Sequence, residues 1–158
     1  MTSGGGRIAI RQMGAADIAR VLDIDRSLPT APHWSEPAYL AALNPAAIPR
    51  RIALVAAEGP DDSPVGFAIA SLLPPEAELE TVAVAAEGQS QGTGRALLER
   101  LLAELWRAGV IEVHLESRVS NQTAMRLYRG LGFAESGRRS GYYADPIEDA
   151  VVMSLTIG

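Results

Sequence analysis

Hydrophobic residues alternate with polar ones, or form short apolar runs bounded by turn residues, in several segments of the chain. Alternation is typical of a β-strand that buries one face, and a short apolar run is typical of a strand that buries both. The pattern predicts strands at residues 7–11, 51–58, 65–73, 77–85, 110–117, 133–139 and 150–157. Because the turn sequence GPDDSP separates the second strand from the third, we expect these two to form a hairpin.

Other segments space their apolar residues by three and four, as an α-helix does. The clearest is residues 93–108, whose apolar face is Leu97, Leu98, Leu101, Leu102 and Leu105. The same spacing predicts a helix at residues 15–27, and Ser35 is suited to cap a short helix that follows it. A fourth helix is predicted at residues 120–129, with Ser120 as its cap.

The predicted order of elements is β-α-α-β-β-β-α-β-α-β-β, which indicates a single mixed α/β domain with an antiparallel start. We assign residues 7–158 to this domain, because they contain no internal repeat and no break in composition. Residues 1–6 (MTSGGG) are small, polar and glycine-rich, so we expect a disordered tail there. No apolar run approaches the roughly 20 residues that span a bilayer, and we therefore expect a cytoplasmic protein without membrane contact.

Composition narrows the chemistry that this chain can perform. Its 158 residues include no cysteine and no lysine, so all 14 strongly basic side chains are arginines. This excludes a thiol nucleophile, a disulfide, a Schiff-base lysine and the lysine of a phosphate-binding loop. With only two histidines, His33 and His114, we expect no metal centre. The net charge of −5 argues against a nucleic-acid partner.

A glycine-rich turn, residues 89–95 (QSQGTGR), lies between a predicted strand and the long helix. Amides at such a helix start favour an anion, and glycines let a diphosphate approach closely. The missing lysine excludes a nucleotide-binding phosphate loop. A dinucleotide site would place a third glycine where Leu97 stands, although Glu116 lies at a suitable distance for a ribose contact. Two interpretations of this turn remain: a coenzyme A site, and a plain turn between strand and helix.

Three motifs carry a resemblance to a known family. Gln89-x-x-Gly92-x-Gly94, after the strand Val82-Ala83-Val84, resembles the acetyl-coenzyme A signature of the general N-acetyltransferase (GNAT) superfamily. Residues 115–121 (LESRVSN) and the pattern A-x-x-L-Y-x-x-L-G-F at residues 124–133 are similar to the same superfamily.

Two further segments resemble its protein N-terminal branch, and most closely the enzymes that acetylate alanine on bacterial ribosomal proteins. These are residues 138–143 (RRSGYY) and the pattern E-D-A-x-x-M at residues 148–153. The resemblance extends from Leu79 to Met153 and is faint before Arg51. In that early part, PHWSE at residues 32–36 resembles the family's Pro-Trp-Ser-Glu segment, with His33 inserted.

The resemblance implies a mixed, mostly antiparallel central sheet flanked by helices. It also implies direct transfer of acetyl from acetyl-coenzyme A (acetyl-CoA) to an amine, which agrees with the absent cysteine because no acyl-enzyme nucleophile is needed. The family's contacts with acetyl-CoA map onto Val82, Ala83, Val84, Gln89, Ser90, Gln91, Gly92, Thr93, Gly94, Arg95, Asn121 and Tyr128. Among these, an amide near Val84 would polarise the thioester carbonyl.

Two residues are expected to handle protons. An α-amine has a pKa of about 8 and must lose a proton before it attacks. The resemblance gives this task to Glu116, which ends an otherwise apolar strand; the alternative is a structural ion pair with Arg118 or Arg126. It makes Tyr128 the acid that protonates the leaving thiolate, whereas packing of its helix is the structural alternative.

The acceptor site is less sharply predicted. His114 lies two residues before Glu116 and so on the same strand face, where it either assists deprotonation or is a partly buried structural histidine. Trp34, Tyr142 and Tyr143 are expected to contact the acceptor, the two tyrosines from a loop between the last strands. The resemblance favours a protein N-terminus as acceptor, with a ribosomal protein as leading candidate. A small-molecule amine and a non-catalytic acyl-CoA sensor are the alternatives.

Overall fold

The protein was analysed as a computed structural model that describes residues 8–89 and 92–158. The predicted tail at residues 1–6, and Ser90 and Gln91 of the glycine-rich turn, therefore lie outside the described residues. The described part forms seven strands in one sheet and four α-helices, in the order predicted from the sequence. Strand and helix boundaries differ from the predicted ones by a few residues at most, except at the end of β6.

The strands are β1 (Ile8–Gln12), β2 (Arg50–Glu58), β3 (Ser63–Leu73), β4 (Glu76–Val84), β5 (Glu112–Arg118), β6 (Ala134–Tyr143) and β7 (Glu148–Thr156). The helices are α1 (Ile18–Ser27), α2 (Glu36–Ala42), α3 (Thr93–Arg107) and α4 (Gln122–Gly130). Two short 3-10 helices, η1 (Ala15–Asp17) and η2 (Ala86–Gly88), precede α1 and the glycine-rich turn.

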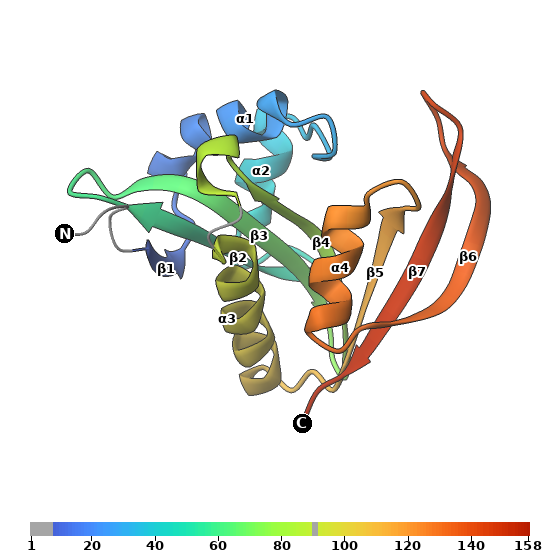
Figure 1. Cartoon of the computed structure of the whole chain (residues 1–158). Coiled ribbons are helices and arrows are strands. Elements are labelled where there is room, and N and C mark those ends of the chain that lie inside the picture. Colours follow the sequence, from blue (N-terminus) through green and yellow to red (C-terminus); the bar gives the residue numbers. More distant parts are fainter. Residues whose placement is uncertain (1–7, 90–91) are drawn as a thin grey trace.

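The strands are arranged in the order β1-β2-β3-β4-β5-β7-β6 (Figure 1). Every neighbouring pair is antiparallel except β4 and β5, which run parallel. The parallel pair is joined by α3. A crossover is needed there because β5 must begin at the same end of the sheet as β4. The sheet is therefore mixed and mostly antiparallel, as the resemblance implies.

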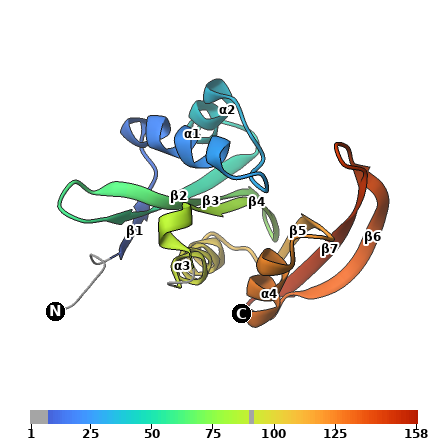
Figure 2. The ribbon, with the colours of Figure 1, turned by 45° about the horizontal axis from the view of Figure 1, so that its top comes forward.

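Helices cover both faces of the sheet, with α1 and α2 on one face and α3 and α4 on the other (Figure 2). The larger core cluster lies under α3 and α4, and it includes Leu97, Leu101, Leu115 and Met153. A second cluster lies under α1 and α2, and it includes Ile24, Tyr39, Phe67 and Ala83. Alternation along β2 and β3 supplies one set of side chains to each cluster, whereas β5 and β7 contribute to the larger cluster only.

Local sequence explains most helix ends, with one correction. The Ser35 side chain caps α2 by accepting a hydrogen bond from the Ala38 amide at 3.2 Å, as predicted. The prediction that Ser120 caps the fourth helix is wrong: Asn121 is the N-cap, and its side chain accepts from the Ala124 amide at 3.3 Å. Ser120 instead donates its hydroxyl to the carboxylate of Glu148, 2.8 Å away.

The end of β6 also differs from prediction. Tyr142 and Tyr143 were expected in a loop, but β6 continues through both of them. The register of β6 with β7 is irregular between Arg139 and Tyr143, after which Tyr143 pairs with Glu148. A bulge of this kind is not visible in the sequence, because its residues fit either a strand or a loop.

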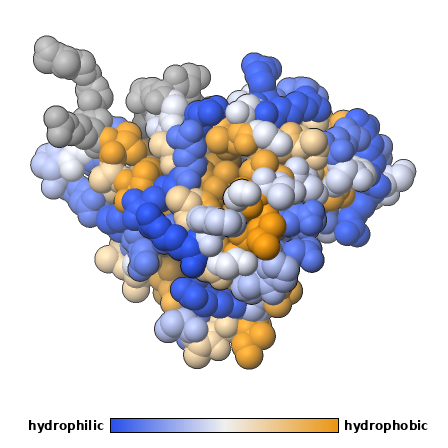
Figure 3. All heavy atoms as spheres, turned by 90° about the horizontal axis from the view of Figure 1, so that it is seen from below, coloured by the Kyte–Doolittle hydropathy of each residue, from blue (hydrophilic) through white to orange (hydrophobic). Residues whose placement is uncertain are grey.

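Seen from below, the surface shows several small hydrophobic patches separated by hydrophilic residues (Figure 3). The large hydrophobic side chains most exposed in the described part are Ile48, Ile147, Leu73, Trp106, Tyr142, Ile111 and Leu40. Within that part, each helix is too short or too polar to cross a membrane.

Candidate active site

The site is organised by an opening in the sheet between β4 and β5. The two strands pair through only three register positions, Glu76 with Glu112, Ala77 with Val113 and Glu78 with His114. Beyond these positions the strands diverge, although β4 continues to Val84 and remains paired with β3. The last part of β4 therefore has one free edge that faces the opening.

The free edge exposes backbone groups of Val84 and Val82. The Ala85 amide donates to the Val65 carbonyl at 2.8 Å, so this amide points toward β3. Backbone groups alternate in direction along a strand, and those of Val84 and Val82 consequently point toward the opening. The side-chain amide of Gln89 donates to the Val84 carbonyl at 2.9 Å, which ties the glycine-rich turn to the end of β4.

The start of α3 lies next to this edge. Gly92, its N-cap, has φ of 79°, a left-handed conformation that L-residues rarely adopt. A Cβ on Gly94 would lie 3.2 Å from Leu127 Cδ2, so a side chain there would press on α4 and displace Leu127. The amides of the first helical turn are the donors that an anionic group can use.

The side chains of Thr93 and Arg95, in the first turn of α3, differ in their hydrogen bonding. Thr93 is buried, and its hydroxyl has no hydrogen-bond partner within the described part of the chain. The exposed Arg95 guanidinium pairs with Glu99 at 3.2 Å and donates to the Gly130 carbonyl at 3.4 Å. Arg95 thus lies between the start of α3 and the end of α4, where it adds positive charge beside the start of α3.

A groove of about 420 Å³ lies beside the junction of β4 and β5. Its polar lining includes Glu76, Glu78, His114, Glu116 and Arg139. The alternation predicted for His114 and Glu116 is confirmed, because both side chains line this groove while Leu115 between them is buried in the core. A smaller cavity of about 190 Å³ lies between α2 and β2 and contains none of the predicted site residues.

Glu116 has one paired and one unpaired carboxylate oxygen. Oε1 lies 3.3 Å from Arg139 Nε, whereas Oε2 is buried and has no hydrogen-bond partner among the described residues. The alternative partners considered from the sequence, Arg118 and Arg126, are wrong. Arg118 instead lies 3.7 Å from Glu148 and stacks over the Tyr143 ring. A buried carboxylate oxygen without a partner is costly, and it is the natural acceptor for a donor that arrives with a ligand.

Tyr128 lies on α4, on the opposite side of the sheet from Glu116. Its side chain is buried and its ring packs against Phe133 with centroids 5.9 Å apart. Burial raises the pKa of Tyr128 above its ordinary value of 10.0, and the neighbouring Tyr143 adds to the shift. The phenol therefore stays protonated and can donate a hydrogen bond or a proton.

Of the three residues predicted to contact the acceptor, two lie near the groove and one does not. Arg139 lies over the Tyr142 ring, 5.5 Å from its centroid, so Tyr142 borders the groove through this arginine. Burial raises the pKa of Tyr143, and the charge of Glu116 adds to the effect, which places Tyr143 near the same carboxylate. Trp34 instead packs on Tyr39 with ring centroids 5.2 Å apart, and the structure does not bring it into the groove.

Sequence reasoning missed three charged residues of the groove, Glu76, Glu78 and Arg139. Partial burial raises the pKa of Glu78, and repulsion from Glu80 and Glu116 adds to the shift. The approach of Glu78 to Glu116 depends on the pairing of β4 with β5, which the sequence does not specify. For Arg139, the register shift of β6 between Glu135 and Gly137 decides which face its side chain occupies.

The geometry combines four elements that an acyl transfer requires. A strand edge and a helix start can bind an extended ligand with an anionic end. An unpaired buried carboxylate oxygen can accept a proton, and a protonated phenol can supply one.

Comparisons with known proteins agree with this arrangement. Residues 18–133 match the acetyltransferase (GNAT) family. The chain is 47% identical over 93 residues to the [ribosomal protein bS18]-alanine N-acetyltransferase of Escherichia coli K12, an alignment that covers 58% of this chain and 63% of that protein. It is 29% identical over 153 residues to a putative enzyme of the same name from Bacillus subtilis, covering 96% and 97% of the two chains.

A solved structure is similar over nearly the whole length. The crystal structure of the ribosomal-protein-S18-alanine N-acetyltransferase from Escherichia coli superposes with a TM-score of 0.83 at 34% identity. The superposition covers 96% of this chain and 95% of that one. The matched residues include the opened sheet, the glycine-rich turn and α4, and the chain therefore belongs to the acetyltransferase (GNAT) family.

Proposed function

We propose that the protein transfers acetyl from acetyl-CoA directly to the α-amine of a protein N-terminus. The observation that carries this proposal is Glu116, whose buried Oε2 has no partner in the described part of the chain and lines the groove beside the opened sheet. The leading acceptor is the N-terminal alanine of ribosomal protein bS18, because two relatives carry that activity in their names.

The chain offers a continuous set of contacts to acetyl-CoA. The first amides of α3, after Gly92, are suited to the diphosphate, and Arg95 adds positive charge beside it. The free edge of β4 at Val82 and Val84 can pair with an extended pantetheine arm as a strand pairs with its neighbour. Asn121 lies at the start of α4, and its side chain can bond to a pantetheine amide in place of its capping bond.

Glu116 receives the proton of the attacking amine in this proposal. Its free Oε2 accepts from the incoming ammonium, and the proton moves to the carboxylate directly or through one water molecule. Arg139 pairs with the other oxygen, which holds the carboxylate in place as the acceptor enters. The backbone amide of Val84 donates to the thioester carbonyl oxygen as negative charge grows there.

Tyr128 supplies the proton that the departing thiolate requires. Because burial raises the pKa of Tyr128, the phenol is fully protonated at neutral pH. The proposed reaction uses backbone amides, one carboxylate and one phenol, and it requires no metal ion.

The groove is suited to a cationic acceptor. Glu76, Glu78 and Glu116 line it, and Arg139 is the arginine among its lining residues. Carboxylates arranged in a shallow groove attract an ammonium group and orient it toward the opening.

The test is mass spectrometry of peptides incubated with the protein and acetyl-CoA. The acceptors are a bS18 N-terminal peptide that begins with alanine, the same peptide with a blocked amine, a polyamine and free alanine. We expect one acetyl group on the free N-terminus of the first peptide only. Acetylation of the polyamine or of free alanine in its place would assign a small-molecule acceptor. Binding of acetyl-CoA with no product from any acceptor would indicate a sensor.

Two variants separate the proton-transfer roles. Tyr128→Phe is expected to lower kcat by about 10²-fold or more while CoA affinity stays within about twofold, because the phenol acts on the leaving group. Glu116→Gln should lower kcat/KM by a similar factor. The rate of this variant should rise with pH in proportion to the deprotonated fraction of the acceptor amine, whose pKa is about 8. Glu104→Gln, on the far part of α3, is the matched control and should leave both constants unchanged. Unaltered kcat in Tyr128→Phe would remove the acid role.

A further inference from the structure

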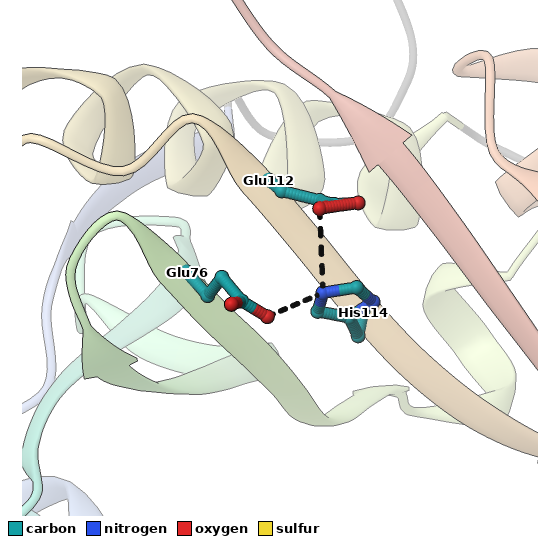
Figure 4. A group of neighbouring side chains, drawn as sticks. All are labelled: Glu76, Glu112 and His114. Carbon is teal, nitrogen blue, oxygen red and sulfur yellow. Dashed lines mark hydrogen bonds and ion pairs between the residues drawn. The ribbon is translucent and has the colours of Figure 1, made fainter.

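A second group of polar side chains lies where β4 and β5 are still paired. Glu76, Glu112 and His114 project toward one another from the two strands (Figure 4). His114 Nε2 lies 2.8 Å from Glu76 Oε1 and 3.9 Å from Glu112 Oε1. One ligand atom from each residue lies within 4.8 Å of the other two.

A chain of hydrogen bonds assigns the proton on the His114 ring. The Val152 carbonyl can only accept, so the Ser136 hydroxyl donates to it, at 3.3 Å. The Ser136 oxygen then accepts from the Ser154 hydroxyl, 3.1 Å away. The Ser154 oxygen in turn accepts from His114 Nδ1–H at 2.9 Å. In neutral His114 the proton therefore sits on Nδ1, and Nε2 presents a lone pair to Glu76.

This arrangement brings three electron-pair donors together with no donor hydrogen between them. The Nε2 lone pair and the Glu76 carboxylate, 2.8 Å apart, repel each other unless a cation lies between them. Glu76 and Glu112 also occupy directly opposed positions of the β4–β5 register, where two like charges destabilise a sheet. A proton on Nε2 can be donated to Glu76 at 2.8 Å but not to Glu112 at 3.9 Å, whereas a metal ion can be bound by all three groups at once.

We propose that Glu76, Glu112 and His114 form a binding site for a divalent transition-metal ion of the zinc type. Nitrogen and carboxylate oxygen bind such an ion at about 2.0–2.2 Å, so ligand atoms at a tetrahedral metal lie about 3.3 Å apart. The distances of 2.8 and 3.9 Å from Nε2 bracket that value. Glu76 is exposed and Glu112 partly exposed, so both carboxylates are free to rotate toward this spacing.

The chemistry of the three ligands selects the metal class. An imidazole nitrogen favours zinc, copper and nickel over magnesium and calcium, which prefer an all-oxygen shell. Three protein ligands leave the remaining position open to water. The bond from Nδ1 to Ser154 is the outer-shell contact that orients a metal-binding histidine and exposes its other nitrogen.

The site shares its groove with Glu116, because Glu76, His114 and Glu116 all line it. His114 and Glu116 are two residues apart on one strand face, a separation of about 6.6 Å. A divalent ion at His114 would therefore repel a cationic acceptor and raise its KM. This consequence rests on the proposed function, whereas metal binding itself does not.

Calorimetric titration of the metal-free protein with Zn²⁺ tests the site. The chain has no cysteine and only one other histidine, so background binding is low. We expect one ion per chain, and binding at least about tenfold weaker in His114→Gln and in the double variant Glu76→Gln/Glu112→Gln. His33→Gln is the matched control and should bind as the parent does. Equal binding by parent and His114→Gln, or no binding by the parent, would overturn the proposal.

Cobalt and activity provide two independent measurements. Co²⁺ bound by His114 should give visible d–d absorption in the parent and lose it in His114→Gln, even where a variant is catalytically impaired. The ratio of acceptor KM with and without Zn²⁺ should exceed one in the parent and fall to one in His114→Gln. Binding with no change in KM would leave the metal site standing and overturn the placement of the acceptor in this groove.

Discussion

Replacing Asp25 with alanine tests the buried anchor of the segment that links α1 to α2. Asp25 has 0% of its surface exposed, and its carboxylate accepts three hydrogen bonds. They come from the His33 amide at 2.7 Å, the Trp34 amide at 2.9 Å and the Tyr39 hydroxyl at 2.6 Å. One side chain thereby fixes a loop of mostly exposed residues to the core under α1 and α2.

The expected loss follows from these three bonds. A hydrogen bond to a charged acceptor contributes about 1.5–3 kcal/mol, so three of them set a ceiling of roughly 4.5–9 kcal/mol. The amides of His33 and Trp34 lie near the surface and can bond to water in the variant, and removing the carboxylate also removes the cost of burying its charge. We therefore expect Asp25→Ala to lower the free energy of unfolding by about 3–4 kcal/mol.

Urea unfolding followed by circular dichroism measures this loss, with the midpoint expected to fall and the m-value to stay constant. For a chain of this size the melting temperature should fall by about 6–16 °C. Tyr39→Phe removes one of the three bonds and should cost about 1–2 kcal/mol. The exposed Asp23 on the same helix is the control, because Asp23→Ala should change stability by less than about 0.5 kcal/mol. A loss below about 1 kcal/mol for Asp25→Ala would refute the anchoring role.

Three further outcomes are expected. Gly94→Val places a methyl group against Leu127, 3.2 Å from the new Cβ, and should weaken CoA binding by about tenfold or more in calorimetry, whereas Gly137→Val, in open space, should not. Because the pKa of Glu78 is raised on folding, its charged form costs stability above that pKa. Glu78→Gln should therefore raise the urea midpoint at pH 7, and the gain should shrink as the pH falls through the raised pKa and vanish below pH 4.5. Ser35→Ala removes the α2 cap and should cost about 1 kcal/mol in the same unfolding assay.

The sequence predicts the elements of this fold well because most of them carry local signals. The leucines of α3 define one helix face, and the Ser35 cap of α2 is a short-range feature. The capping error at α4 arises because Ser120 and Asn121 are equally good caps in isolation. Their assignment depends on Glu148, which lies 28 residues away and binds Ser120.

The groove was predicted only in part, because several of its contacts join residues distant in the chain. Glu116 and His114 share a face by simple alternation, which the sequence reveals. The Arg139 partner of Glu116 depends on how β7 pairs with β5 and with β6, and the approach of Glu76 to Glu112 depends on how β4 pairs with β5. Pairing between strands that a helix or another strand separates along the chain has no local signature, and neither contact could be found from residue spacing.

The three-residue junction between β4 and β5 has a consequence for how the molecule opens. It leaves β1–β4 and β5–β7–β6 as two hydrogen-bonded units of one sheet, while the core under α3 and α4 runs beneath both. Amide hydrogens of the two units should therefore exchange with different opening free energies in the ligand-free protein. A ligand that pairs with the free edge of β4 and also contacts α4 would link the two units, and its binding should bring their exchange rates together.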